Sequence, residues 1–169
     1  DIMRIVSSDK GCVEYRKRMV RSAKIFVPEH VLSEMTDHAQ TGLDEESEVI
    51  GLIIGEVYED DGGKYAIIHR TTTSVLLADS RHAEFDERFF DEMFASMEFV
   101  GRECVVGWYH SHLDLGCYMS PVDVRTQDGI FSGEFGFAIV IDPVRRELKV
   151  FDTKIGDPQP IDMVIMEAD

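Results

Sequence analysis

One stretch of the sequence predicts a buried β-strand that ends in two histidines: Cys104-Val105-Val106-Gly107-Trp108-Tyr109-His110-Ser111-His112. The run before the histidines is short and apolar, which is typical of a strand buried on both faces. Because successive side chains of a strand point to opposite faces, His110 and His112 share one face. Two neutral imidazoles, with a pKa of about 6.5, can donate lone pairs to one metal ion there. The alternative is a pair of structural histidines.

A serine and an aspartate follow in the segment Ser120-Pro121-Val122-Asp123. Asp123 could supply an oxygen ligand from the first turn of a helix and complete a His₂Asp set. Catalytic zinc sites typically hold three protein ligands and leave a fourth position for water. The same segment also fits a helix start, with Ser120 as the N-cap, Pro121 as the first helical residue and Asp123 stabilising the first turn. The pattern by itself leaves both interpretations open.

Another acid, Glu48, opens an apolar segment that extends to Gly55 and predicts a second buried strand. A carboxylate near a buried strand needs a partner, because unpaired burial is costly. A water held by zinc would be such a partner. The alternative is an exposed acid that continues the run Glu45-Glu46.

The remaining pattern predicts a sheet flanked by helices. A helix should start at Pro28 and stop at Gly42, and another should begin near Ser120. Apolar residues from Phe85 to Met97 recur at helical spacing and are typical of core packing. Strands are expected over 24–27, 64–73, 135–141, 148–151 and, as a last edge strand, 161–165. This order indicates an α/β or α+β fold, with residues 24–169 as one domain and 1–23 as a segment of unclear structure.

Composition restricts the partners and the compartment. The chain has 169 residues, of which 44% are hydrophobic and 30% charged, and a formal net charge of −16. This charge disfavours nucleic acid and anionic membrane surfaces as partners, and the apolar runs are too short to span a bilayer. Cys12, Cys104 and Cys117 form no C-x-x-C pair and are odd in number, so we expect no disulfide framework and a cytoplasmic location.

The spacing Glu48 … His110-x-His112-x₇-Ser120-x₂-Asp123 resembles the signature of the JAMM (MPN+) zinc metalloproteases. Within that family, residues 105–112 and 120–127 are similar to the deubiquitinating subunit of the proteasome lid. The resemblance covers roughly residues 25–155. It implies a curved mixed β-sheet packed with helices, similar to cytidine deaminases, and a JAMM/MPN+ catalytic domain over 24–169.

The resemblance also implies roles for the site residues. His110, His112 and Asp123 would be ligands of Zn²⁺, Glu48 the general acid and base, and Ser120 a donor to the developing oxyanion. Cys117 would serve the loop or the substrate, because a fourth protein ligand would close the site. One departure concerns the loop: the family usually has Pro-Gly after the second histidine, where this chain has Leu113-Asp114.

The implied substrate is the C-terminal Gly-Gly tail of ubiquitin or a ubiquitin-like protein joined to a lysine, with the proteasome or an associated ATPase complex as a partner. The tail would pair with a sheet edge in the segment 74–85, where Val75, Leu76 and Leu77 suit such pairing. Alternatives within the family are a non-catalytic scaffold and a hydrolase acting on sulfur-carrier proteins. A zinc base deaminase is disfavoured, since H-x-E and P-C-x-x-C do not occur.

Overall fold

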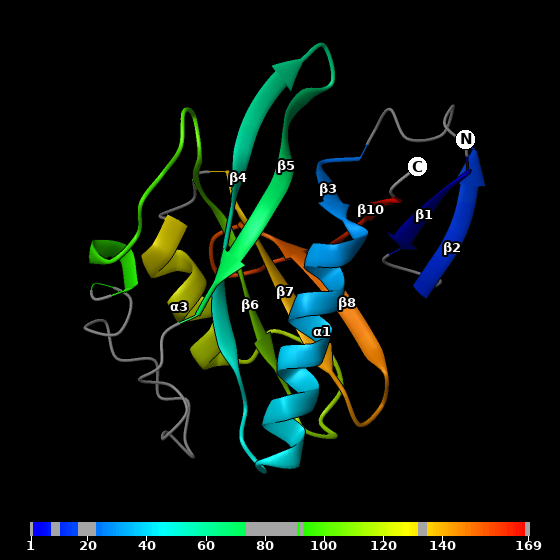
Figure 1. The fold of residues 1–169 in the computed structure, drawn as a ribbon, viewed down its shortest axis with the longest axis vertical. Helices are drawn as coiled ribbons and strands as arrows, with labels where there is room; N and C mark the ends of the chain where they lie inside the picture. The colour runs from blue at the N-terminus through cyan, green and yellow to red at the C-terminus, as the bar shows by residue number, and fades with distance from the viewer. Residues whose placement is uncertain are drawn as a thin grey trace.

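The computed structural model describes the backbone of residues 2–7 and 11–16 and the full residues 23–73, 91, 93–131 and 135–167. Within these ranges the strands form one sheet in the order β2-β1-β10-β3-β5-β4-β6-β7-β8-β9. The pairs β10–β3, β3–β5 and β6–β7 are parallel and the others antiparallel, so the sheet is mixed. Figure 1 shows this sheet with α1 running across it and the β4–β5 hairpin projecting beyond it. The expected mixed sheet packed with helices is confirmed.

The elements have the following bounds: β1 Ile2–Ser7, β2 Gly11–Arg16, β3 Ile25–Pro28, α1 Glu29–Asp44, β4 Ile50–Asp60, β5 Gly63–Thr72, β6 Cys104–Ser111, α3 Pro121–Phe131, β7 Phe137–Asp142, β8 Glu147–Asp152, β9 Pro160–Ile161 and β10 Met163–Met166. No helix in the described ranges has the length and apolar character that crossing a membrane requires. These bounds show that most of the strands expected from the sequence form, with shifts of a few residues at their ends.

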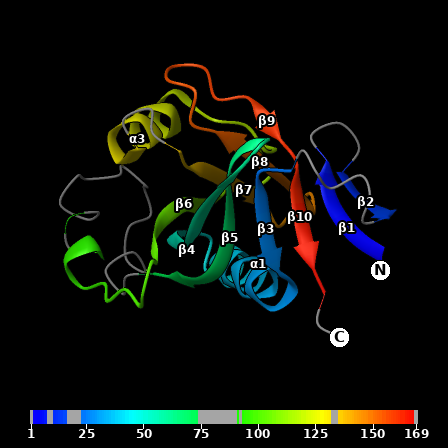
Figure 2. The same ribbon diagram turned by 90° about the horizontal axis from the view of Figure 1, so that it is seen from above.

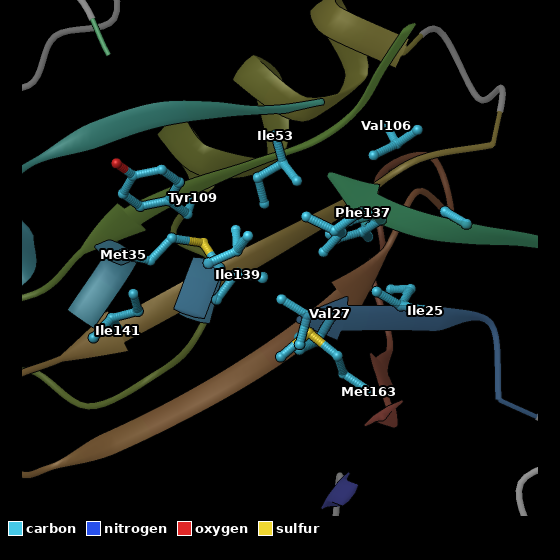
Figure 3. Close-up of a cluster of buried hydrophobic side chains, with 14 of the residues drawn as sticks. Ile25, Val27, Met35, Ile53, Val106, Tyr109, Phe137, Ile139, Ile141 and Met163 are labelled. Carbon is cyan, nitrogen blue, oxygen red and sulfur yellow. The ribbon is translucent and has the colours of Figure 1, made fainter. Parts of the chain in front are cut away.

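Helices α1 and α3 lie on opposite faces of the sheet (Figure 2). Val31, Met35 and Ala39 recur on one face of α1 and are buried against the sheet. Figure 3 shows the resulting core, in which Met35 packs near Tyr109 and Ile139. The hydroxyl of Tyr109 also pairs with His38 Nδ1 at 2.7 Å, which ties α1 to β6.

Strand β6 divides its side chains between these two faces. Its register with β4 skips Val106, which is a bulge residue between Val105 and Gly107. Val106 and Tyr109 consequently both join the core under α1, whereas Trp108 joins the smaller core on the face of α3. This bulge determines that the histidines, in phase with Trp108, face α3.

The expected end of α1 was wrong. Gly42 lies inside the helix, which continues to Asp44, and the left-handed residue is Glu46 with φ of 54°. The amide of Ser47 closes the end by donating to the carbonyl of Gly42 at 2.8 Å. A glycine is needed at 42 for close approach instead, because a Cβ there would lie 2.5 Å from Val49 Cγ1.

The expected edge strand over 161–165 was also wrong in its position. The segment divides into β9, which lies at the edge beside β8, and β10, which lies inside the sheet between β1 and β3. Residues 2–7 and 11–16 form the hairpin β1–β2 that covers β10 (Figure 1). Apolar and polar residues do not alternate clearly in this hairpin, so it was not predicted from the sequence. The segment that forms β10 was therefore expected at an edge of the sheet.

Candidate metal centre

The two histidines lie where β6 ends, beside its parallel neighbour β7. The amide of His112 donates to the carbonyl of Ile141 at 2.9 Å, which extends the strand geometry one residue beyond β6. His110 and His112 are 1% and 5% exposed, and their ring centroids are 5.1 Å apart. The strand alternation therefore brings both imidazoles to one buried face, as the sequence predicts.

Asp123 reaches the same point from the first turn of α3. Its Oδ2 lies 3.1 Å from His110 Nε2 and 3.4 Å from His112 Nε2. It is 4% exposed, although aspartate is among the residues least often buried without a partner. Three donor atoms from these side chains lie within 4.8 Å of one another. The triad is therefore placed to bind a metal ion.

The helix-start interpretation of the Ser120–Asp123 segment is confirmed, and it is compatible with metal binding by Asp123. The amide of Asp123 donates to Ser120 Oγ at 3.1 Å, and the amide of Ser120 donates to Asp123 Oδ2 at 2.8 Å. This reciprocal pair is a capping box. It fixes the Asp123 carboxylate at the helix start, so the cap positions the carboxylate beside the two histidines.

The chemistry of the donor set fits zinc. His112 Nδ1 lies 2.8 Å from the carbonyl of Gly116, and since a carbonyl only accepts, Nδ1 carries the hydrogen. Nε2 of the neutral ring then offers its lone pair on the side of Asp123. Two imidazole nitrogens and one carboxylate oxygen match the three-ligand catalytic zinc sites that keep one position open.

Neighbouring groups shift the pKa of two side chains of the triad, Asp123 and His112. Burial alone raises the pKa of Asp123, but His110 and His112, which donate to the carboxylate when their Nε2 atoms carry hydrogen, outweigh it and bring that pKa well below its usual range. For His112, burial opposes protonation, while the Asp123 carboxylate and the Gly116 carbonyl raise the pKa above its ordinary value. The carboxylate is therefore ionised at neutral pH, as metal ligation requires.

Glu48 lies in the segment before β4 and is tied to the histidine strand. Val49 donates its amide to Ser111 Oγ at 2.8 Å, and Ser111 donates its amide to the carbonyl of Val49 at 3.0 Å. Burial raises the pKa of the half-buried Glu48, and the charges of His112 and His110 oppose the rise. Glu48 is thus electrostatically coupled to the triad. The anchoring role of Ser111 was missed, because its partner is 62 residues away.

Trp108 and Gln127 lie beside the triad and help to hold it in place. The indole of Trp108 stacks on His110 with ring centroids 4.4 Å apart, and its Nε1 donates to Gln127 Oε1 at 2.7 Å. Gln127, which is fully buried on α3, also donates to the carbonyl of Asp152. Since Gln127 is one helical turn after Asp123, its bond with Trp108 connects the helix that carries the aspartate to the strand that carries the histidines. A buried glutamine at this spacing was the signal that could have indicated it.

Cys117 points into the protein. Its thiol is buried, donates to the carbonyl of Val140 at 3.3 Å, and has a pKa raised to about 11 by burial. The thiol is therefore protonated at neutral pH and is not in the metal-binding group. A contact of Cys117 with substrate stays a prediction. Val75, Leu76 and Leu77 lie outside the described residues.

The departure at Leu113-Asp114 has a structural counterpart. Asp114 has φ of 61°, the left-handed region that favours glycine. Its carboxylate and carbonyl accept hydrogen bonds from Arg145 at 3.0 and 2.9 Å. The loop therefore makes the turn without glycine and adds a contact to the β7–β8 turn.

Comparison with known proteins agrees with this geometry. Residues 21–131 match the JAB1/Mov34/MPN/PAD-1 ubiquitin protease family. The 26S proteasome non-ATPase regulatory subunit 14 of Drosophila melanogaster is 32% identical over 127 residues, covering 72% of this chain and 39% of that protein. Ubiquitin carboxyl-terminal hydrolase RPN11 of Saccharomyces cerevisiae is 30% identical over 126 residues, with the same coverage. The COP9 signalosome complex subunit 5 of Candida albicans is 31% identical over 145 residues, covering 79% of this chain and 22% of that protein.

The chain thus spans about two fifths of the proteasomal relatives. Among solved structures, protein DSY2949 of Desulfitobacterium hafniense superposes with a TM-score of 0.62. It is 22% identical, and the match covers 85% of this chain and 94% of that one, so it supports the fold alone. The match over residues 21–131 includes the whole triad. The chain belongs to the JAB1/Mov34/MPN/PAD-1 ubiquitin protease family.

Proposed function

We propose that this chain is a zinc-dependent isopeptidase. It hydrolyses the bond between the C-terminal Gly-Gly of ubiquitin, or a ubiquitin-like protein, and a lysine side chain. The observation that carries the proposal is the buried His110–His112–Asp123 triad, with its donor atoms within 4.8 Å, in a chain of this family. A family member that serves only as a scaffold has no need to keep such a donor set buried.

His110, His112 and Asp123 would hold the zinc ion. A zinc ion bound there would supply Lewis acidity, which polarises a carbonyl and lowers the pKa of water. Glu48 is the residue that moves the proton, from the attacking water to the leaving amine of the lysine. Burial raises its pKa from the ordinary value toward neutrality, the direction that suits a group that must both accept and return a proton.

Ser120 can cap the helix and donate to the oxyanion at the same time. Its Oγ accepts the amide of Asp123 through a lone pair, which leaves its own hydrogen available. The hydroxyl is half-buried at the start of α3, beside the Asp123 carboxylate. It is therefore held in place by the cap before substrate arrives, which is the condition for preorganised stabilisation of a developing charge.

The substrate and partner rest on the relatives. RPN11 carries the name of a ubiquitin carboxyl-terminal hydrolase, and other relatives are regulatory subunits of the 26S proteasome. By extension, the modifier is ubiquitin or a protein with the same slim Gly-Gly tail, and the partner is the proteasome or an associated ATPase complex.

The test is Glu48→Gln. Glutamine keeps the shape of the side chain and loses the base, so zinc content should be unchanged and the rate should fall by about 10²–10⁴-fold. The measurement is cleavage of ubiquitin and ubiquitin-like conjugates of a lysine peptide, together with metal analysis. Glu45→Gln is the matched control, because this exposed acid lies three residues away on the same segment.

A Glu48→Gln protein within a few-fold of the parent rate would show that Glu48 is only an acid before a strand. If the unaltered protein binds zinc and cleaves no conjugate of the panel, the isopeptidase proposal is wrong. His112→Ala should abolish zinc binding, and retention of zinc by that variant would contradict the assignment of the ligands.

A further inference from the structure

Asp142, at the end of β7, is a buried carboxylate that the proposed chemistry does not use. It is 0% exposed and accepts four backbone N–H groups. These come from Asp114 at 3.2 Å, Gly116 at 2.8 Å, and Val144 and Arg145 at 3.1 Å each. Burial by itself raises the pKa of Asp142, but these amides outweigh it and lower that pKa below its ordinary value. The carboxylate is therefore ionised, and both of its oxygens accept hydrogen bonds.

The two oxygens of Asp142 serve different parts of the chain. Oδ1 accepts from Val144 and Arg145, which shapes the β7–β8 turn, and also from Asp114. Oδ2 accepts from the amide of Gly116, and the Nε atom of Arg145 lies 4.0 Å from it. An aspartate that only shaped its own turn would need no bond to Gly116, which is 26 residues away.

Gly116 carries this constraint to a metal-ligating side chain. Its amide is held by Asp142, and its carbonyl accepts the hydrogen of His112 Nδ1 at 2.8 Å. Its φ of 81° is left-handed, so the loop takes a conformation that few other residues adopt. The position of this carbonyl determines which nitrogen of His112 carries hydrogen and how the ring is turned toward Asp123.

We propose that Asp142 is a positioning residue for the metal centre, which acts through Gly116 to fix the tautomer and orientation of His112. It touches neither metal nor substrate. The inference rests on the proposed metal role of His112, but not on the identity of the substrate. Groups that orient a ligating histidine from behind typically change metal affinity by about 10–100-fold when they are altered.

Asp142→Asn is the selective test. With its oxygen in the Oδ1 position, asparagine keeps the bonds to the turn, and its NH₂ group then faces the amide of Gly116, where it cannot accept. Zinc affinity, measured by competition with a chelator, should fall by about 10–100-fold. In the metal-free protein, at a pH where the His112 ring is neutral, its ring ¹⁵N signals should change from the Nδ1–H form to a mixture of tautomers.

Gly116→Pro gives a second route to the same bond, should Asp142→Asn fold poorly. Proline has no amide hydrogen, so it removes the Gly116–Asp142 bond, and because it cannot take a φ of 81° it also shifts the loop that carries the Gly116 carbonyl. The same loss of affinity and the same change of tautomer are expected. Glu103→Gln is the matched control, because this carboxylate also accepts a backbone amide but lies at the opposite end of β6.

Zinc affinity within about threefold of the parent and an unchanged His112 tautomer in both variants would overturn the proposal, and Asp142 would then be only a turn residue. If the unaltered protein binds no zinc, the metal centre itself fails. The ¹⁵N signals of His112 in the metal-free variants would still decide whether Asp142 orients that ring.

Discussion

A carboxylate lies near each end of strand β6, and the two carboxylates use different partners. Glu103, just before the strand, has a side chain that is 7% exposed and accepts from the amide of Val100 at 3.0 Å. Its other partners are His69 at 3.0 Å and Arg70 at 3.3 Å, whose side chains are 35% and 41% exposed. Asp142, beside the other end, is 0% exposed and accepts four backbone amides.

This difference shows which end of the strand is more strictly determined. Exposed side chains such as Arg70 can exchange a carboxylate for water at little cost. The amide of Gly116 is buried and has no such alternative, and leaving a buried amide unpaired costs about 1–3 kcal/mol. The other three amides that donate to Asp142 are part-buried. The Glu103 end therefore joins a turn to the sheet, whereas the Asp142 end holds a loop in one conformation beside the proposed metal ligands.

The largest expected effect separates the two carboxylates directly. Asp142→Ala should lower the free energy of unfolding by about 3 kcal/mol, because the buried amide of Gly116 and three part-buried amides lose their acceptor. Glu103→Ala should cause a smaller loss, since its partners His69 and Arg70 are partly exposed and water can replace the carboxylate there. Denaturant titration of both variants at pH 7 measures the difference. Equal losses would remove the distinction between the two ends.

A smaller effect concerns pH. The amide of Val100 and the side chains of His69 and Arg70 lower the pKa of Glu103 to about 2, whereas an unfolded glutamate has a pKa of about 4.3. A carboxyl with a lower pKa in the folded state contributes stability above the unfolded pKa and loses it as the pH falls toward the folded pKa. Stability should therefore decline between about pH 5 and pH 2.

Glu103→Gln tests this sign, because the variant cannot titrate at that position. Its free energy of unfolding should fall less steeply than that of the parent when the pH is lowered from 5 to 3. Chemical unfolding at several pH values measures the two slopes. Parallel curves would mean that Glu103 is not the group that titrates, and that its contacts with His69 and Arg70 do not persist in solution.

The smallest effect is expected within the loop that follows the two histidines. Asp114→Gly removes the ion pair between Asp114 and Arg145, in which the two side chains are 66% and 46% exposed, respectively. It also relieves the left-handed φ of 61° at position 114. Both changes are worth at most about 1 kcal/mol and oppose each other. Zinc affinity should be unchanged, because the backbone amide at 114 still donates to Asp142. A tenfold loss of affinity would show that the exposed pair, and not Asp142 alone, holds the loop.

Much of the candidate site could be predicted from the sequence because the rules involved are local. Strand alternation places His110 and His112 on one face, and the Ser120–Asp123 cap is formed by residues three positions apart. The strands around them were expected from apolar runs between turns. Glu48 could be selected only through the family signature, since an acid before a strand has no local pattern of its own.

The supporting contacts could not be predicted, because each joins segments far apart in the chain. Asp142 meets Gly116, Ser111 meets Val49, and Trp108 meets Gln127 only after β6 is paired with β4 and β7 and covered by α3. The Val106 bulge, which sets the phase of the histidines relative to α1, likewise depends on the pairing with β4. By itself, the sequence determined which side chains could ligate a metal. The tertiary structure decided how those side chains are oriented, because orientation depends on hydrogen bonds between segments that only the sheet order brings together.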